Sequence, residues 1–156
     1  MLIQGKNLVF RKQVTLYPLS SKWGNPFPSY ATDGITGNDI CTGETGKILH
    51  TDPSKKEVWV RVDFGHSKGI QYVYIHDRII GEPHHTRLAG TDIIVYGQNP
   101  LENRRLCNRV TLNDVLSGVE IYKVCGNVLV GSGVELYQGP RNEGHMIHIC
   151  EIEVYG

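Results

Sequence analysis

Apolar and polar residues alternate at a spacing of two along much of the chain, and this alternation constrains the fold more than any other feature. The clearest example is Val58–Phe64, which reads VWVRVDF. Because successive side chains of a strand point to opposite faces of a sheet, this pattern predicts a strand with one buried face. Helical periodicity is nearly absent. We therefore expect a chain built mainly of β-strands.

Other segments show the same alternation or are rich in β-branched and aromatic residues. The predicted strands are Asn7–Phe10, Val14–Leu19, Val58–Phe64, Ile70–Asp77, Asp92–Tyr96, Val119–Val124, Val128–Val130, Val134–Tyr137 and His145–Tyr155. Short helical turns are expected near Ser29–Asp33 and Asn113–Leu116. Many short strands, punctuated by 18 Gly and 7 Pro, are typical of an antiparallel sandwich or barrel.

The length of 156 residues fits a single domain, residues 1–156, with a sizeable core. The 16 basic and 16 acidic residues balance, which argues against a nucleic-acid or anionic-membrane partner. No apolar run approaches the roughly 20 residues of a membrane span, and Met1–Lys6 is too short for a secretory signal. Either a signal has been removed or the chain is one module of a longer protein. Without repeats there is one site per chain, so multivalency needs a homo-oligomer or tandem modules.

Four cysteines permit three pairings, and no Cys-x-x-Cys spacing of the zinc-binding type occurs. One interpretation is a cytosolic protein with four buried thiols. The other, which we prefer, is a secreted domain with two disulfides.

His50, Arg78 and Arg87 each flank a predicted strand, which is where binding loops commonly extend from a rigid sheet. Each residue taken alone is most simply a surface residue. Together they offer one neutral ring acceptor and two forked cationic donors. Such a set suits a ligand rich in hydroxyl oxygens.

Four stretches carry a resemblance to the F-type lectins, the fucose-binding fucolectin family, in order and spacing across nearly the whole chain. They are Ile48-Leu49-His50-Thr51, Trp59-Val60-Arg61-Val62-Asp63-Phe64, Val73-Tyr74-Ile75-His76-Asp77-Arg78 and Thr86-Arg87-Leu88-Ala89-Gly90. Asn7-Leu8-Val9, Ala31-Thr32-Asp33-Gly34 and Ile149-Cys150-Glu151-Ile152-Glu153-Val154 extend it toward the two ends. The resemblance implies an all-β, antiparallel jelly-roll β-sandwich of the discoidin type, with its binding loops at one end.

The resemblance also implies that His50, Arg78 and Arg87 bind terminal L-fucose. Trp23 and Phe27, in the turn-rich loop between Tyr17 and Ser29, are either the apolar wall that faces the fucose methyl group or core residues beneath that loop.

The sequence departs from the family pattern near Arg78. Ile80 stands where the family has an Asp two residues after this Arg, and Glu82 is a possible substitute. Where the family often has two adjacent Cys, the chain has Gly81-Glu82-Pro83-His84-His85. His84 or His85 could stack on the sugar or face water. These departures suggest an altered fine specificity more than a different class of ligand.

By the same resemblance, we expect disulfides Cys107–Cys125 and Cys41–Cys150. It further implies a structural Ca²⁺ bound by the carboxylates of Asp33 and Glu151 and by carbonyls near Tyr30, Ile35 and Cys41. A hard cation of this kind binds several oxygens, and here it would rigidify the loops.

The sequence shows no Ser/His/Asp or Cys/His arrangement and no paired acids in a motif context, so we do not expect an enzyme. The predicted function is that of a secreted, calcium-stabilised lectin that binds fucosylated glycans in recognition, agglutination or innate defence. The alternative is a discoidin-type adhesion module that binds phospholipid, protein or another glycan, with Trp23 and Phe27 as membrane-inserting residues. A third possibility is a degenerate lectin that acts as a recognition domain.

Overall fold

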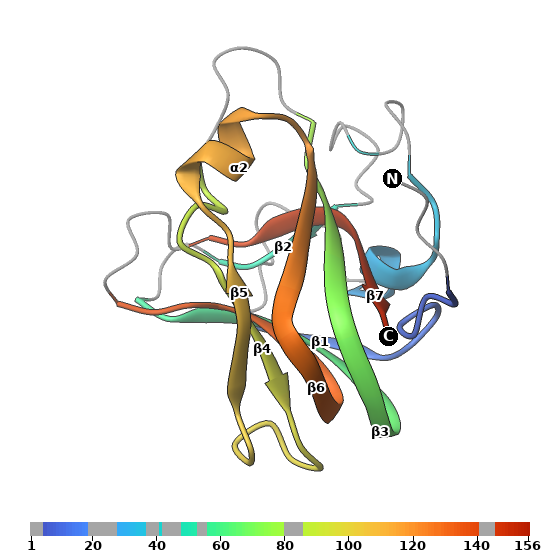
Figure 1. Ribbon diagram of the computed structural model, residues 1–156. Coiled ribbons are helices and arrows are strands. Elements are labelled where there is room, and N and C mark those ends of the chain that lie inside the picture. Colours follow the sequence, from blue (N-terminus) through green and yellow to red (C-terminus); the bar gives the residue numbers. More distant parts are fainter. Residues whose placement is uncertain are drawn as a thin grey trace.

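The structure is a computed structural model, and it describes residues 5–18, 28–36, 41, 48–52, 56–79, 86–140 and 146–156. Its elements are β1 (Val14–Tyr17), the 3-10 helix η1 (Pro28–Thr32), β2 (Leu49–His50), β3 (Val58–Asp77), β4 (Asp92–Tyr96), β5 (Arg105–Arg109), α2 (Leu112–Leu116), β6 (Glu120–Gln138) and β7 (His148–Tyr155). All strand pairs are antiparallel. The fold class is therefore the expected all-β, antiparallel one (Figure 1).

Two long strands organise the molecule. The hydrogen-bonded order is β2-β7-β3-β6-β4-β5, and β1 pairs with β3. The first part of β3 pairs with β1 and with the end of β6, whereas its last part pairs with β7 and with the start of β6. Register shifts lie between Asp63 and Lys68 and between Ile70 and Tyr72, where the two parts meet. β3 and β6 therefore contribute to both layers of the sandwich.

The core forms between these two parts, as the alternation in the sequence predicts. Val60 and Val62 from the first part of β3 and Val73 and Ile75 from its last part are at most 1% exposed and belong to one cluster. Each fully buried aliphatic side chain of this kind contributes about 1.5 to 3 kcal/mol to folding. A Cβ at Gly133 would overlap the ring of Tyr96, so this position requires glycine.

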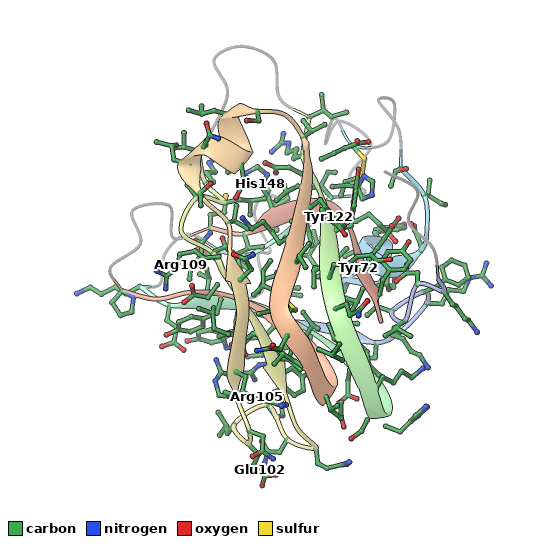
Figure 2. The ribbon with its side chains drawn as sticks, in the orientation of Figure 1. Tyr72, Glu102, Arg105, Arg109, Tyr122 and His148 are labelled. Carbon is green, nitrogen blue, oxygen red and sulfur yellow. A yellow bond between two sulfur atoms is a disulfide. The ribbon has the colours of Figure 1, made fainter. Side chains whose placement is uncertain are left out.

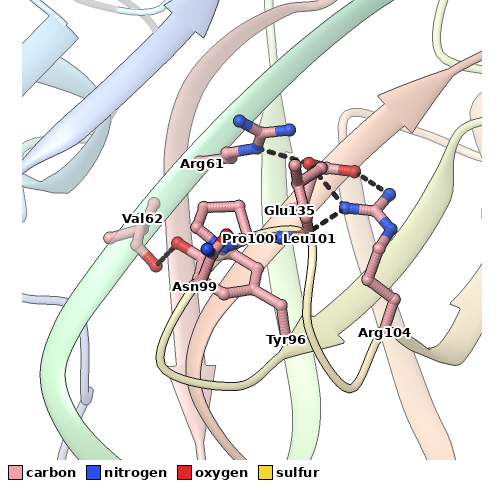
Figure 3. Close-up of polar contacts among 8 residues, drawn as sticks. All are labelled: Arg61, Val62, Tyr96, Asn99, Pro100, Leu101, Arg104 and Glu135. Atoms are coloured by element: carbon pink, nitrogen blue, oxygen red, sulfur yellow. Dashed lines mark hydrogen bonds and ion pairs between the residues drawn. The ribbon is translucent and has the colours of Figure 1, made fainter.

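A buried carboxylate joins the strands on the outer side of the first part. Glu135 on β6 is fully buried, and its Oε2 accepts a hydrogen bond from Arg61 Nε on β3 at 2.5 Å (Figure 3). Arg104, which precedes β5, donates to the two oxygens of Glu135 at 2.5 and 3.1 Å. Three chain segments are thereby tied to one buried charge.

Both disulfides implied by the resemblance are present. Cys107 on β5 is bonded to Cys125 on β6. Cys41 is bonded to Cys150 on β7 across a sequence separation of 109 residues. Within the described residues, no helix has the length and apolar character needed to cross a bilayer.

Most predicted elements are confirmed, with changes to their limits. The prediction for Asp92–Tyr96 matches β4, and the two predicted helical turns correspond to η1 and α2. Predicted strands 58–64 and 70–77 are parts of β3. The predicted strand 119–124, without Val119, and those at 128–130 and 134–137 are parts of β6. Among the described residues, the predicted strand Val14–Leu19 shortens to Val14–Tyr17, and the predicted strand His145–Tyr155 shortens to His148–Tyr155.

The predicted strand Asn7–Phe10 is wrong, because this segment forms turns. The Asn7 side chain accepts hydrogen bonds from the backbone N–H groups of Val9 and Val154, each at 3.1 Å, in place of a strand ladder. Sequence reasoning also missed β2, which has two residues, and β5, whose Leu106 is exposed and obscures the alternation.

Candidate functional site

His50, Arg78 and Arg87 lie at one end of the sandwich. His50 is the last residue of β2, Arg78 follows the last residue of β3, and Arg87 lies in the turn that precedes β4. The guanidinium charges of both Arg78 and Arg87 lower the pKa of His50. The structure therefore brings together the three residues that the sequence singled out.

His50 is held as a neutral ring. Its side chain is 6% exposed, and its ring stacks on that of His148, with centroids 5.6 Å apart. Burial, together with the charges of Arg78 and Arg87, lowers the pKa of His50 to about 4. Its buried Nδ1 has no hydrogen-bond partner among the described residues. At neutral pH the ring is therefore uncharged, and a neutral ring carries one nitrogen that can accept a hydrogen bond.

Arg78 adjoins a buried carboxylate that the sequence analysis did not select. Asp77 is 3% exposed, and its Oδ1 accepts the backbone N–H of Arg78 at 2.7 Å and lies 3.8 Å from His148 Nδ1. Burial raises the pKa of Asp77 to about 7, although the N–H and charge of Arg78 and the charge of Arg87 oppose the rise. Burial and Arg87 lower the pKa of Arg78, and Asp77 opposes this change.

Arg87 is exposed, and its turn is fixed by a buried amide. Its terminal nitrogen donates to Met146 Sδ at 3.3 Å. The Nε2 of Gln138, which is fully buried at the end of β6, donates to the carbonyls of Arg87 at 2.7 Å and Met146 at 3.0 Å and to Thr91 Oγ1 at 3.0 Å. One side chain therefore sets the distance between the Arg87 turn and the segment before β7.

This arrangement suits recognition of neutral hydroxyl groups. Two forked guanidinium groups supply donors, and the His50 ring supplies an acceptor. Because Arg78 and Arg87 carry like charges and influence one another, a ligand that places oxygen lone pairs between them relieves their repulsion.

A second polar cluster joins the residues after η1 to β7. Glu151 is fully buried, contrary to the simple expectation of an exposed strand residue, and its Oε1 accepts the N–H of Gly34 at 2.9 Å. Its Oε2 is buried and has no hydrogen-bond donor among the described residues. Burial raises the pKa of Glu151 to about 9; the Gly34 N–H opposes the rise, and Asp33 and Glu153 add to it. The structure therefore brings Asp33 and Glu151 together.

The other predicted cation ligands are carbonyl groups near Tyr30, Ile35 and Cys41, and these three residues lie in different environments. Tyr30 is half-buried in η1, and the N–H of the exposed Ile35 donates to Asp33 Oδ1 at 2.8 Å. The carbonyl of Cys41 accepts from Ile79 N at 2.8 Å. Among the described residues there is no group of three or more His, Cys, Asp or Glu placed to hold a metal ion. Any cation here would need carbonyl oxygens beside the two carboxylates.

Several predicted residues lie outside the described residues. They are Trp23 and Phe27 of the first long loop and Glu82, His84 and His85 of the loop that replaces the adjacent Cys pair.

Sequence reasoning missed Asp77, His148 and Gln138. In the sequence, only the position of Asp77 next to Arg78 could have marked it as a residue of the site. His148 is recognisable only from the register, which sets it opposite His50 on β7.

Solved structures with a similar fold include several carbohydrate-binding modules. No protein-family model and no curated protein sequence matches the chain. The lectin domain of lectinolysin, solved with Lewis b antigen, superposes with a TM-score of 0.75 at 19% identity, over 98% of both chains. A fucose-binding module of Streptococcus pneumoniae gives a TM-score of 0.71 at 21% identity, over 97% of this chain and 95% of that one. The fucolectin from Morone saxatilis (striped bass) serum gives 0.73 at 21% identity, over 99% of this chain and 50% of that one.

The chain therefore has the discoidin-like β-sandwich fold of F-type lectins, as the sequence resemblance implied. At this level of identity the likeness concerns the fold, and the ligand has to be argued from the site.

Proposed function

We propose that this domain is a non-enzymatic lectin that binds terminal L-fucose on glycans. The observation that carries the proposal is the convergence of His50, Arg78 and Arg87 at one end of the fold. Support comes from the structural neighbours, which include a fucose-binding module and a lectin domain solved with Lewis b antigen.

The proposed binding mode follows from the directions of the available hydrogen bonds. The neutral His50 ring accepts from one sugar hydroxyl, and the two guanidinium groups donate to other hydroxyls or to the ring oxygen. Asp77 and His148 lie behind these groups and fix their positions. Lectin contacts to one sugar are few, so useful avidity would come from a homo-oligomer or tandem modules.

We further propose that Ca²⁺ stabilises the domain at Asp33 and Glu151. The fit rests on the buried Oε2 of Glu151, which has no donor among the described residues, and on the neighbouring carboxylate of Asp33. Carbonyl oxygens near Tyr30, Ile35 and Cys41 would complete the shell, as hard cations require. The bound ion would hold the segment after η1 against β7.

Secretion is part of the same proposal. The two disulfides support it, because such bonds persist mainly in oxidising compartments. Glycans presented on cell surfaces or glycoproteins would then be the natural partners, in recognition, agglutination or defence.

Calorimetric titration with L-fucose, with D-galactose as the control sugar, tests the binding proposal. Arg78→Ala and Arg87→Ala should each abolish measurable fucose binding and leave the fold intact, because each removes one of the two guanidinium donors on which the few contacts to the sugar depend. Arg105→Ala is the matched control, since Arg105 lies on β5 away from His148 and the loop end (Figure 2).

Selective fucose binding by the wild type and Arg105→Ala, and none by the two site variants, would support the assignment. Unchanged affinity in both site variants would refute it. A folded domain that binds neither sugar but binds phospholipid vesicles would favour the discoidin-type adhesion module instead.

A further inference from the structure

A buried polar bridge lies beneath the loop end and joins two of the three residues of the proposed sugar site. We call it the Gln138–Thr51 bridge; it consists of the side chains of Gln138 and Thr51 and of the segment Met146–Ile147 between them. Gln138, Thr51 and Ile147 are fully buried, and Met146 is 7% exposed. The hydrogen bonds of the bridge are therefore largely removed from water.

Gln138 is fixed by the strand that carries it. It is the last residue of β6 and lies opposite Val58, the first residue of β3. Leu136, two residues earlier, points into the core, so the Gln138 side chain is on the same side of the sheet. Its hydrogen bond to the Arg87 carbonyl places it at the loop end of that core. A rigid element, and not a loop, therefore holds the amide group.

The partners of Gln138 fix which way its amide group is turned. Its Nε2 lies within 3.0 Å of three oxygens, which are the carbonyls of Arg87 and Met146 and Oγ1 of Thr91. The reverse orientation would set Oε1 against two carbonyl oxygens, which cannot donate. A lysine here would also supply donors, but it would bring a further positive charge close to Arg87. Glutamine alone combines two donors, no charge and this reach.

The bonds that Gln138 makes hold the Arg87 backbone beside the segment on which its guanidinium group rests. Gln138 joins the carbonyls of Arg87 and Met146 at 2.7 and 3.0 Å, and Arg87 Nη1 donates to Met146 Sδ at 3.3 Å. A thioether sulfur is a weak acceptor, so the last contact by itself holds the guanidinium group poorly. The position of this group therefore depends on the backbone bonds of Gln138.

Thr51 attaches the same segment to the strand that carries His50. Thr51 N donates to the carbonyl of Ile147 at 2.9 Å, and Thr51 Oγ1 accepts from Ile147 N at 2.9 Å. Thr51 directly follows His50, the last residue of β2. The segment Met146–Ile147 is thus attached to the His50 strand on one side and to the Arg87 turn on the other.

We propose that Gln138 is a positioning residue that sets Arg87 at its distance from His50, with Thr51 as the second attachment of the bridge. Neither Gln138 nor Thr51 touches the sugar in this proposal. The inference rests on the proposed fucose site, and it adds that affinity depends on a buried amide beneath that site. A monosaccharide offers few hydrogen bonds, so a displaced guanidinium group loses contacts that the other residues do not replace.

The first test compares fucose affinity in wild type, Gln138→Leu and Glu135→Gln by calorimetric titration. Gln138→Leu removes the amide at similar volume and should weaken binding by about tenfold or more, an effect typical of residues that orient a ligating group. Glu135→Gln is the matched control, because it also removes a buried polar group of β6, but one whose partners are Arg61 and Arg104. It should bind fucose like the wild type.

The titrations are made at a temperature at which circular dichroism shows each protein to be folded. A mere loss of stability then leaves the affinity unchanged, whereas a displaced Arg87 lowers it.

A second measurement follows Arg87 without any sugar. The chain has two methionines, so methyl labelling of Met gives two NMR signals, and Met146 is the one whose sulfur contacts Arg87. In Gln138→Leu the Met146 signal should move in the direction seen in Arg87→Ala, because the guanidinium group leaves Met146 Sδ. In Glu135→Gln it should keep its wild-type position.

Thr51→Val tests the other attachment of the bridge. It removes the hydroxyl group that accepts from Ile147 N and keeps the shape and the backbone bond, so it should fold and should weaken fucose binding less than Gln138→Leu does. Should Gln138→Leu fail to fold, wild-type affinity and an unmoved Met146 signal in Thr51→Val would overturn the proposal.

Three results with a folded Gln138→Leu would each overturn the proposal: wild-type fucose affinity, a loss of affinity equal to that of Glu135→Gln, or an unmoved Met146 signal. A wild-type domain that binds no fucose would refute the fucose proposal instead. The Met146 signal would then decide by itself whether Gln138 positions Arg87.

Discussion

At the scale of residues, His50 and Asp77 belong to one buried cluster in which burial favours the neutral form of each. It lowers the pKa of His50 to about 4 and raises that of Asp77 to about 7. Between about pH 5 and pH 7 the imidazole is neutral and much of the carboxyl group is protonated. The guanidinium groups of Arg78 and Arg87 keep their charge across this range. Such a cluster presents cationic donors to hydroxyl oxygens without a fully ionised carboxylate to compete for them.

Replacement of Asp77 by Asn should change how stability depends on pH. In the folded protein Asp77 keeps its proton up to about pH 7, against a reference value of 3.8, so its contribution to stability is greatest at low pH and is lost as pH rises through 7. The Asp77→Asn variant does not lose stability in this way as the pH rises, because Asn does not titrate. Its free energy of unfolding relative to wild type should therefore increase by up to about 1.4 kcal/mol per pH unit between about pH 4 and 7, and stay constant above.

Urea unfolding of both proteins at pH 4.5, 6 and 8 measures this difference. The depressed pKa of His50 has the opposite effect: its contribution is present above pH 6.5 and is lost as pH falls toward 4. Because His50 is present in both proteins, its contribution largely cancels in the difference. A difference that does not vary with pH would contradict the raised pKa of Asp77.

At the scale of elements, the long strands β3 and β6 depend on the buried carboxylate of Glu135 (Figure 3). The side chain of Glu135 is fully buried, whereas those of Arg61 and Arg104 are 19% and 29% exposed. The Arg61 guanidinium also lies 3.7 Å from the Trp59 ring centroid. The segment before β5 is thus tied to both strands through charges that are largely removed from water.

Glu135→Gln should destabilise the domain by roughly 2 to 5 kcal/mol, because it leaves two guanidinium groups around a site without its charge. The matched control is Asp92→Asn, which breaks the pair between Arg109 and Asp92 at 2.5 Å. There the Arg109 side chain is 60% exposed. This variant should lose no more than about 1 kcal/mol. Guanidinium chloride unfolding compares them, and equal losses would show that the burial of Glu135 adds no stability.

At the scale of the whole molecule, two of the links between the N-terminal third of the chain and β7 end at the neighbouring residues Cys150 and Glu151. One is the Cys41–Cys150 disulfide. The other is the hydrogen bond from Gly34 to Glu151, across 117 residues of sequence. In the chain-entropy model, a disulfide that closes a loop of this length restricts the unfolded chain by about 4 to 5 kcal/mol. A cation at Asp33 and Glu151 would strengthen the same connection.

Addition of Ca²⁺ should therefore raise the Tm of the wild-type domain, and a chelator should reverse the rise. At a calcium concentration 100 times the Kd, the free energy of unfolding gains about 2.7 kcal/mol. Glu151→Gln should abolish the response. Glu102→Gln, which changes an exposed carboxylate between β4 and β5, should keep it. Differential scanning fluorimetry measures all three proteins, and a wild-type Tm that ignores both calcium and chelator would contradict the cation proposal.

The alternation in the sequence was sufficient to predict the β-rich class, because it depends on neighbours along the strand. It did not show that residues 58–64 and 70–77 form one continuous strand. Gly65, whose φ of 85° lies in the left-handed region, and the register shifts that follow mark the junction. Nor did it show the two-residue strand β2, which exists because β7 offers Ile149 and His148 as partners.

For the candidate site, the sequence identified His50, Arg78 and Arg87 through their resemblance to a family pattern, and the two disulfides in the same way. The residues behind them carry no such signal. Asp77 resembles an ordinary polar residue at a strand position, and only packing makes it a buried carboxylate.

The sequence by itself thus determined the strand character of the chain, its pattern of cysteines and the residue types available for binding, because these are properties of local order and composition. Tertiary structure decided which of those residues meet. The convergence of His50 with His148 and the burial of Glu135 between two arginines both arise from pairing between distant segments of the chain. That pairing is set by register and by burial of the core, which no short stretch of sequence contains.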